Sequence, residues 1–196
     1  MIGMRDAGTN AAVDWFGADF ARLHPSLQGL HREGGKLRGK VAITAGRGVA
    51  GVLGRRIARR LGIPTGEPLS DFEVRISHDA QTMRWERHFG TGRTLLSVFR
   101  PVGQYPGGYW LEDTVAVRLK LTVDLRDGGW YWRLQGASLR GMPLPLWLFR
   151  GTEAYKSVDA EGGYRFAVAF AMFPFGVLLR YEGVLWPARA VQTAQR

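Results

Sequence analysis

From about residue 70 onward, hydrophobic and polar residues alternate along the chain, and this alternation predicts β-strands. Phe72, Val74 and Ile76 stand between polar residues, and the same spacing returns over residues 83–89. A period of two is typical of a strand that buries one face and exposes the other. We therefore predict an antiparallel sheet of about eight strands over residues 66–187, with consecutive strands joined by hairpins.

The most regular alternation covers residues 111–125 and predicts one long strand. Its odd positions are mostly apolar and its even positions are mostly polar. A flat strand of this length would extend about 50 Å, so the strand must bend and the sheet must coil. Asp127-Gly128 predicts a two-residue hairpin turn that sets Leu125 opposite Trp130. We expect six residues to be buried on the inner face of this strand, namely Leu111, Val115, Val117, Leu119, Leu121 and Val123.

The first third of the chain has a helical pattern instead. Trp15, Phe16, Phe20 and Leu23 recur at helical spacing, and a second helix is predicted over residues 48–61. Helices that precede a run of strands indicate an α+β fold. We expect N-terminal helices followed by a strongly curved antiparallel β-sheet that forms a half or closed barrel, because curling removes exposed strand edges.

The length of the chain fits a single domain over residues 1–196. Residues 1–65 would form a helical part that packs on the sheet, with a short strand over residues 40–45. Residues 66–187 would form the sheet itself, and residues 188–196 a tail.

The composition excludes several kinds of chemistry. The chain has no cysteine, so thiolate catalysis, disulfides and thiolate zinc sites are ruled out. Its net charge is +10, yet only four of its 27 basic residues are lysine. The basic residues are scattered apart from Arg55, Arg56, Arg59 and Arg60. A nucleic-acid-binding protein normally shows a continuous basic stripe, so we expect no nucleic-acid partner.

No segment has the pattern of a signal peptide or of a membrane span. The longest apolar stretch, residues 166–179, has 14 residues and is interrupted by Pro174 and Gly176. A spanning helix needs about 20 apolar residues. We therefore expect a cytoplasmic protein.

Two motifs that suggest a cofactor or a metal lack the context that these groups need. Residues 46–51 fit G-x-G-x-x-G, which holds a dinucleotide pyrophosphate at a helix N-terminus. A Rossmann fold also needs repeated βαβ units, and no helix is predicted between the strands after Ser70. The four histidines show no metal-ligand spacing, and Pro25 breaks the helix that would align His24 with His31. We expect no cofactor and no metal.

Six short motifs follow one another along nearly the whole chain: Leu23-His24-Pro25, Leu61-Gly62-Ile63-Pro64, Trp85-x-Arg87-x-Phe89, Leu111-Glu112, Gly141-Met142-Pro143-Leu144-Pro145 and Tyr181-Glu182-Gly183. With these motifs in this order, the chain resembles a bacterial family known as domain of unknown function 4166. The resemblance implies a single domain. It implies no particular chemistry, because the family has no assigned function.

Two charged residues occupy positions where the alternation predicts an apolar face. Arg87 shares a face with Trp85 and Phe89, and Asp113 shares a face with Leu111. A charge at such a position is costly unless it is paired or faces a wet cavity. Two interpretations stay open: a structural ion pair between Arg87 and Asp113, or a functional site in a largely apolar pocket.

In the functional interpretation, Arg87 holds a carboxylate, carbonyl or enolate oxygen, and Asp113 or Glu112 acts as a general acid or base. In the structural interpretation, the alternative to the ion pair is a β-bulge near this point that turns Asp113 outward and Glu112 inward. The residues expected to line the ligand are Trp85, Arg87, Trp130, Trp132, Phe166, Phe170 and Tyr181.

These features together predict binding of a hydrophobic small molecule, lipid-like or polyketide-like, in an apolar cavity of the curved sheet. The alternative is a cofactor-independent enzyme, of the cyclase or isomerase type, that performs acid–base chemistry in the same cavity. A weak contact with an anionic membrane, through the arginines and residues 143–149, is a third hypothesis. The sequence leaves the identity of the ligand and the oligomeric state open.

Overall fold

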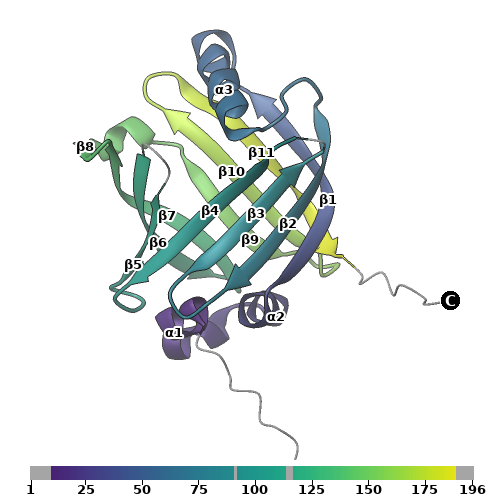
Figure 1. Cartoon of the computed structure of the whole chain (residues 1–196), viewed down its shortest axis with the longest axis vertical. Coiled ribbons are helices and arrows are strands. Elements are labelled where there is room, and N and C mark those ends of the chain that lie inside the picture. The colour runs from purple at the N-terminus through teal and green to yellow at the C-terminus, as the bar shows by residue number, and fades with distance from the viewer. Residues whose placement is uncertain (1–9, 91, 114–116, 189–196) are drawn as a thin grey trace, which may run out of the picture.

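Ten antiparallel strands close into a barrel in the computed structural model, which describes residues 10–90, 92–113 and 117–188 (Figure 1). The neighbours around the barrel are β6-β5-β4-β3-β2-β1-β11-β10-β9-β7, and the pairing of β6 with β7 completes the circle. A short strand, β8, continues from β7 as a hairpin. The strands are β1 Gly35–Ala45, β2 Leu69–His78, β3 Met83–Phe89, β4 Thr94–Val102, β5 Tyr109–Asp113, β6 Val117–Arg126, β7 Gly129–Leu139, β8 Met142–Leu144, β9 Glu153–Val158, β10 Tyr164–Met172 and β11 Gly176–Pro187.

The barrel is closed and has ten strands, where the sequence predicts about eight in a half or closed barrel. One reason is that residues 111–125, expected as a single strand, contribute to two. β5 and β6 form a hairpin in which Asp113 pairs with Arg118. The predicted hairpin between β6 and β7 is confirmed, with Leu125 opposite Trp130. Its register shifts once, after Lys120.

The β5–β6 hairpin reverses which positions point inward. Every paired residue of β5 lies opposite a residue of β6 with the other parity, so even positions face inward in β5 and odd positions in β6. Leu111 therefore lies on the outer face, contrary to expectation. Val115 lies outside the described residues. The other four expected residues face inward: Leu121 and Val123 are buried, and Val117 and Leu119 are partly buried.

Three short helical segments cover one end of the barrel: α1 Ala11–Phe16, the 3-10 helix η1 Gly17–Arg22 and α2 Pro25–Glu33. The side chain of Asn10 caps α1 by accepting hydrogen bonds from two backbone N–H groups of its first turn. The ring of Trp15 lies 5.3 Å from that of Trp110, and the ring of Phe16 lies 4.8 Å from that of Trp130. Aromatic packing therefore closes this end.

The opposite end carries α3 Gly48–Leu61, inserted between β1 and β2, and the 3-10 helix η2 Leu146–Phe149 (Figure 1). The residues of α3 that are buried are small: Ala50, Gly51, Gly54 and Ala58. A Cβ atom at Gly54 would overlap the carbonyl oxygen of Leu178 in β11. The helix therefore touches the barrel backbone to backbone. It ends at Gly62, whose φ of +72° allows its N–H to reach the carbonyls of the last turn.

Within the described residues, no helix has the length and apolar character needed to cross a membrane.

We expect Gly54→Ala to lower the stability of the protein, although alanine is the better helix former. The added methyl group must push α3 away from Leu178, at a cost of about 1–3 kcal/mol. The matched control is Gly29→Ala in α2, where a Cβ meets no atom within 4 Å. This control should raise the free energy of unfolding by up to about 1 kcal/mol. Urea denaturation measures both values, and equal gains in the two variants would contradict the close packing of α3.

Candidate functional site

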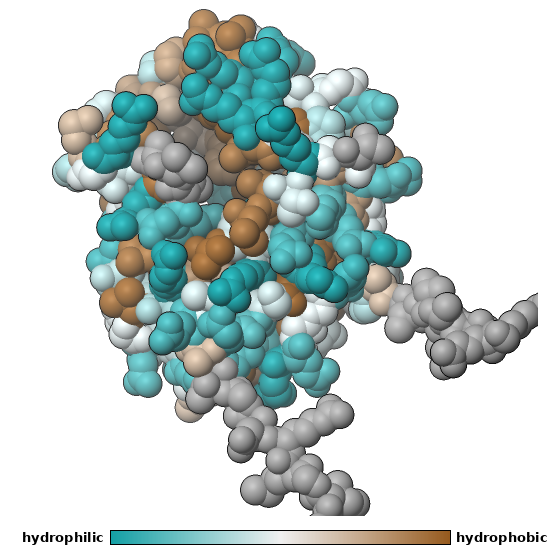
Figure 2. Space-filling view, in the orientation of Figure 1, coloured by the Kyte–Doolittle hydropathy of each residue, from teal (hydrophilic) through white to brown (hydrophobic). Residues whose placement is uncertain are grey.

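Several inward-facing residues near the α3 end of the barrel are partly accessible to solvent. At the end covered by α1 and α2, inward-facing residues such as Ile76, Met83 and Trp110 are fully buried. Toward α3, inward-facing Phe72, Phe89 and Leu179 are buried. Others are only partly buried, namely Leu95, Leu119, Leu134, Val168 and Phe170. Figure 2 shows the surface hollowed below α3, with hydrophobic residues beside the hollow. We call this opening the mouth of the barrel.

Arg87 lies inside the barrel and is the centre of a polar group there. The side chain is 8% exposed. Its Nη1 donates a hydrogen bond of 2.8 Å to the hydroxyl of Tyr181 in β11, and its Nη2 donates to the hydroxyl of Ser97 in β4. Its Nε has no hydrogen-bond partner among the described residues. A buried guanidinium is thus held by two hydroxyl groups and keeps an unused donor.

Asp113 does not reach this group, which corrects the expected ion pair with Arg87. The carboxylate lies on the outer face of the barrel, 2.9 Å from Arg100 and 2.6 Å from Arg118. The reason is the parity reversal at the β5–β6 hairpin described above, rather than a bulge. The expectation that Asp113 points into the cavity is wrong.

Glu112 faces inward instead. It pairs with Phe99 of β4 and with Leu119 of β6 in the two ladders. Burial raises the pKa of Tyr181, and the charge of Glu112 adds to the rise while Arg87 opposes it. Glu112 therefore faces the interior in which Arg87 and Tyr181 lie.

The other residues expected to line a ligand all lie on the inner surface. Trp130, Phe166 and Tyr181 are buried, and Trp85, Trp132 and Phe170 are partly buried. Of these residues, Tyr181 and Trp85 contact Arg87. We call the six residues the aromatic wall. Ring contacts connect this wall to the rest of the core. Their role in binding stays a prediction.

A second polar group, which the sequence analysis missed, lies deeper in the barrel. The Nζ atom of Lys156 in β9 lies 2.6 Å from Nε2 of His31 in α2. The other ring nitrogen of His31 lies 3.1 Å from Nε2 of His78 at the end of β2. Lys156 is 1% exposed and His31 is fully buried. The only signal in the sequence is that Lys156 shares a face with Ala154 and Val158.

Aromatic rings take the place of a carboxylate beside Lys156. Its Nζ lies 3.6 Å from the ring centroid of Trp130 and 4.3 Å from that of Trp85. Burial lowers the pKa of Lys156 well below its ordinary value, and burial also lowers the pKa of His31. Trp85 contacts Arg87 as well, at 5.9 Å. One indole ring thus joins the Arg87 group to the Lys156 group.

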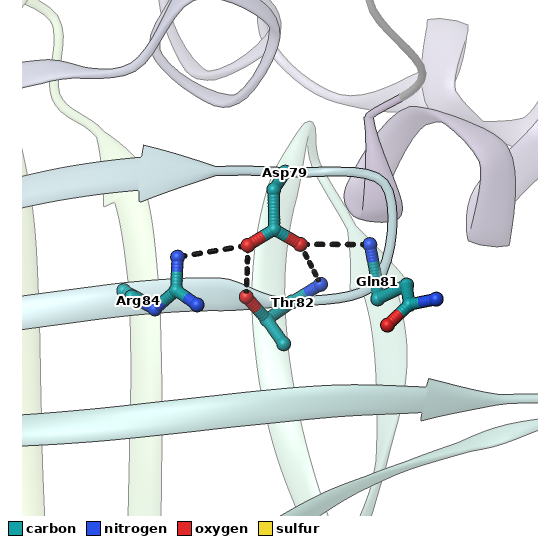
Figure 3. A network of polar contacts seen from close by, with 4 residues as sticks. All are labelled: Asp79, Gln81, Thr82 and Arg84. Atoms are coloured by element: carbon teal, nitrogen blue, oxygen red, sulfur yellow. Dashed lines mark hydrogen bonds and ion pairs between the residues drawn. The ribbon is translucent and has the colours of Figure 1, made fainter.

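His78 lies where this deeper group approaches the outside. It lines a surface pocket of about 400 Å³ together with Asn10, Arg32, Glu33, Gly34, Asp79 and Ala80. The neighbouring turn is held by the carboxylate of Asp79, which accepts hydrogen bonds from Gln81, Thr82 and Arg84 (Figure 3). The hydrogen bond from the Thr82 hydroxyl contributes most to lowering the pKa of Asp79 to about 2.

In the G-x-G-x-x-G motif, the neighbouring backbone explains why glycine occurs at positions 46 and 51. A Cβ atom at Gly46 would overlap the carbonyl oxygen of Val177, and one at Gly51 would overlap that of Gly46. Glycine at these positions permits the close approach of α3 to β11.

In the described part of the chain, no three histidine or acidic side chains gather in a way that would hold a metal ion.

The sequence profile of the family described as domain of unknown function (DUF4166) matches residues 23–185. The match covers most of the chain, so the chain belongs to this family. No curated protein matches the chain.

We expect His78→Gln to flatten the dependence of stability on pH. Burial, followed by the charge of Lys156, lowers the pKa of His78 to about 4, and Asp79 opposes the shift. In the unfolded chain the same histidine takes up its proton near pH 6.5, so the unfolded state binds more protons between about pH 6.5 and 4. The free energy of unfolding therefore falls as the pH drops through this range, and His78→Gln removes that part of the fall.

Urea denaturation at several pH values between these limits measures the slope. The control is His88→Gln on the outer face of β3, which we expect to keep the slope of the unmodified protein. A slope in His78→Gln as steep as in the control would contradict the burial of His78.

Proposed function

We propose that this member of the DUF4166 family binds an apolar small molecule that carries an acceptor oxygen, with that oxygen held by Arg87 inside the barrel. The proposal rests on the burial and the hydrogen bonding of Arg87. This side chain is a buried cation whose hydrogen bonds go to two hydroxyls and whose Nε is unused within the described residues. Burying a guanidinium without an acidic partner is costly, and an oxygen of a ligand would offset that cost.

The two hydroxyls strengthen this interpretation. Each accepts a hydrogen bond from Arg87, so the O–H groups of Tyr181 and Ser97 stay available as donors. Three donors from three strands then converge on one region. Such a set suits a carboxylate or carbonyl oxygen, because several fixed donors stabilise its charge without reorganising.

The surroundings of Arg87 favour an apolar body for the same ligand. The inner surface is lined by aromatic and aliphatic side chains, and those near the mouth are accessible to solvent. Small-molecule sites are typically largely apolar with a few well-placed polar groups. A lipid-like or polyketide-like compound has this combination of an apolar body and a polar end.

A second candidate function is acid–base catalysis on such a compound without a cofactor, of the cyclase or isomerase type. The observation that favours it is the inward position of Glu112 near Tyr181. In this candidate, Glu112 moves a proton while Arg87 stabilises the oxygen on which negative charge develops. A binding protein needs only the second of these two roles.

We expect the protein to bind cis-parinaric acid, a fluorescent fatty acid, more tightly than the methyl ester of the same acid. Arg87→Met should weaken binding of the acid about 10- to 100-fold, because it removes a charged donor, and should change binding of the ester much less. Arg165→Met, on the outer face of β10, is the matched control and should bind both probes normally. Circular dichroism verifies the fold. A folded Arg87→Met protein that binds the acid as tightly as the unmodified protein would rule out this role of Arg87.

We expect the second candidate to be decided by Glu112→Gln. Native mass spectrometry identifies the compound that co-purifies with the protein, and this compound then serves as the substrate. If the protein is an enzyme, Glu112→Gln should bind the compound and convert it at least about 100-fold more slowly. Asp113→Asn on the outer face is the control and should keep the rate. Conversion at an equal rate by both variants would eliminate Glu112 as the acid or base.

A further inference from the structure

The exposed large hydrophobic residues gather at the end of the barrel that carries the mouth. Among the described residues, all but Val102 and Trp186 lie in the half of the molecule that faces α3. The largest contributions come from three places: the start of α3, the β8–η2 segment and the β10–β11 turn. The two most exposed residues in each place are Val49 and Val52, Met142 and Trp147, and Phe173 and Phe175. We call this set the apolar rim.

Two of these places form one continuous patch. The ring of Trp147 lies 5.6 Å from that of Phe173, and the N–H of Phe173 donates a hydrogen bond of 2.7 Å to the carbonyl of Leu148. Both rings nevertheless remain about half exposed. A soluble protein rarely leaves paired aromatic rings in water, so this patch indicates a contact surface.

The arginines of α3 stand beside the apolar rim. The helix has four arginines near its end and no acidic residue. None of the four forms an ion pair with a residue that the structure describes. On the barrel wall, in contrast, Arg38, Arg100 and Arg180 each pair with a carboxylate. Among the described residues, these arginines thus have no carboxylate partner.

The outward face of α3 combines the two kinds of side chain. Val49, Val52, Arg56 and Arg59 follow at spacings of three and four residues, so they share one face of the helix. That face lies opposite the small residues that touch β11. Figure 2 shows hydrophobic and hydrophilic residues side by side over α3. The valines lie toward the start of this face and the arginines toward its end. At the surface of a lipid bilayer, valines can contact acyl chains while arginines contact phosphate groups.

We propose that the mouth end of the barrel, formed by the apolar rim and the arginines of α3, docks on an anionic lipid bilayer. A bilayer offers phosphates to the arginines and an apolar layer to Trp147 and Phe173 at the same time. A nucleic acid would satisfy only the arginines. A second copy of the chain would place two arginine-rich helices against each other, and like charges repel.

The inference goes beyond the proposed function and concerns only the outer surface. If both hold, the mouth faces the bilayer, and an apolar ligand passes between membrane and barrel without crossing water. The two are tested by different residues, since Arg87 lies inside the barrel and the docking surface lies outside it.

We expect the protein to sediment with vesicles of phosphatidylcholine that contain roughly one third phosphatidylglycerol, and to stay in solution with phosphatidylcholine alone. High salt should release it. The double variant R56E/R59E should reduce the partition coefficient by about tenfold or more. The matched control is R75E/R165E, which makes the same charge change on the barrel wall and should bind as the unmodified protein does. Trp147→Ser should weaken binding, whereas Trp186→Ser, at the other end of the barrel, should not.

Equal losses in the rim variants and in their matched controls would overturn the proposal, because only net charge would then matter. Equal sedimentation with both kinds of vesicle would overturn it as well. So would tight binding to a DNA duplex, measured by fluorescence anisotropy, together with no binding to vesicles. Arg87→Met should sediment normally, and failure of the interior site would thus be seen separately from failure of the docking surface.

Discussion

The ladder between β1 and β11 is the contact on which the rest of the structure depends. It joins residues 37–45 to residues 179–187 and so connects the two ends of the chain. Most other neighbours in the barrel follow each other in sequence and pair through local turns. This long-range ladder joins the strands on either side of it into one sheet, which the β6–β7 pairing then closes into a barrel. Glycine at 39 and 183 allows it, because a Cβ atom at either position would meet the backbone of the partner strand.

Closure gives the interior two buried basic side chains in unusual surroundings. Arg87 is held by hydroxyls, and Lys156 is held by an imidazole and two indole rings. Water would screen such groups if the barrel were an open sheet. α1 and α2 cover one end of the barrel, and several inward-facing side chains at the other end are partly exposed. The preference of Arg87 for an oxygen and the neutral tendency of Lys156 are both consequences of that closed geometry.

Local patterns predicted the local parts of the fold and the site. The alternation and Asp127-Gly128 were enough for the β6–β7 register, and the positions of Trp85 and Phe89 were enough to place Arg87 inside. Asp113 was misplaced because the parity of a strand pair depends on the length of its connecting loop, and alternation alone does not reveal a loop. The contact between Lys156 and His31 spans 125 residues. It depends on the β1–β11 ladder and on the docking of α2, and a single sequence contains no trace of such distant contacts.

The net charge of +10 does not indicate a binding partner by itself; the positions of the charged residues do. A basic composition by itself favours no partner, and several arginines of the barrel wall are matched by nearby carboxylates. The arginines of α3 form no ion pair with any described residue, and exposed valines share the same helix. Among the described residues, several arginines on the barrel wall are paired with carboxylates, whereas those of α3 are not. The two ends of the barrel therefore differ in unpaired positive charge. The two proposals thus involve the same end of the barrel: ligand entry at the mouth, and attraction of the α3 arginines to an anionic surface.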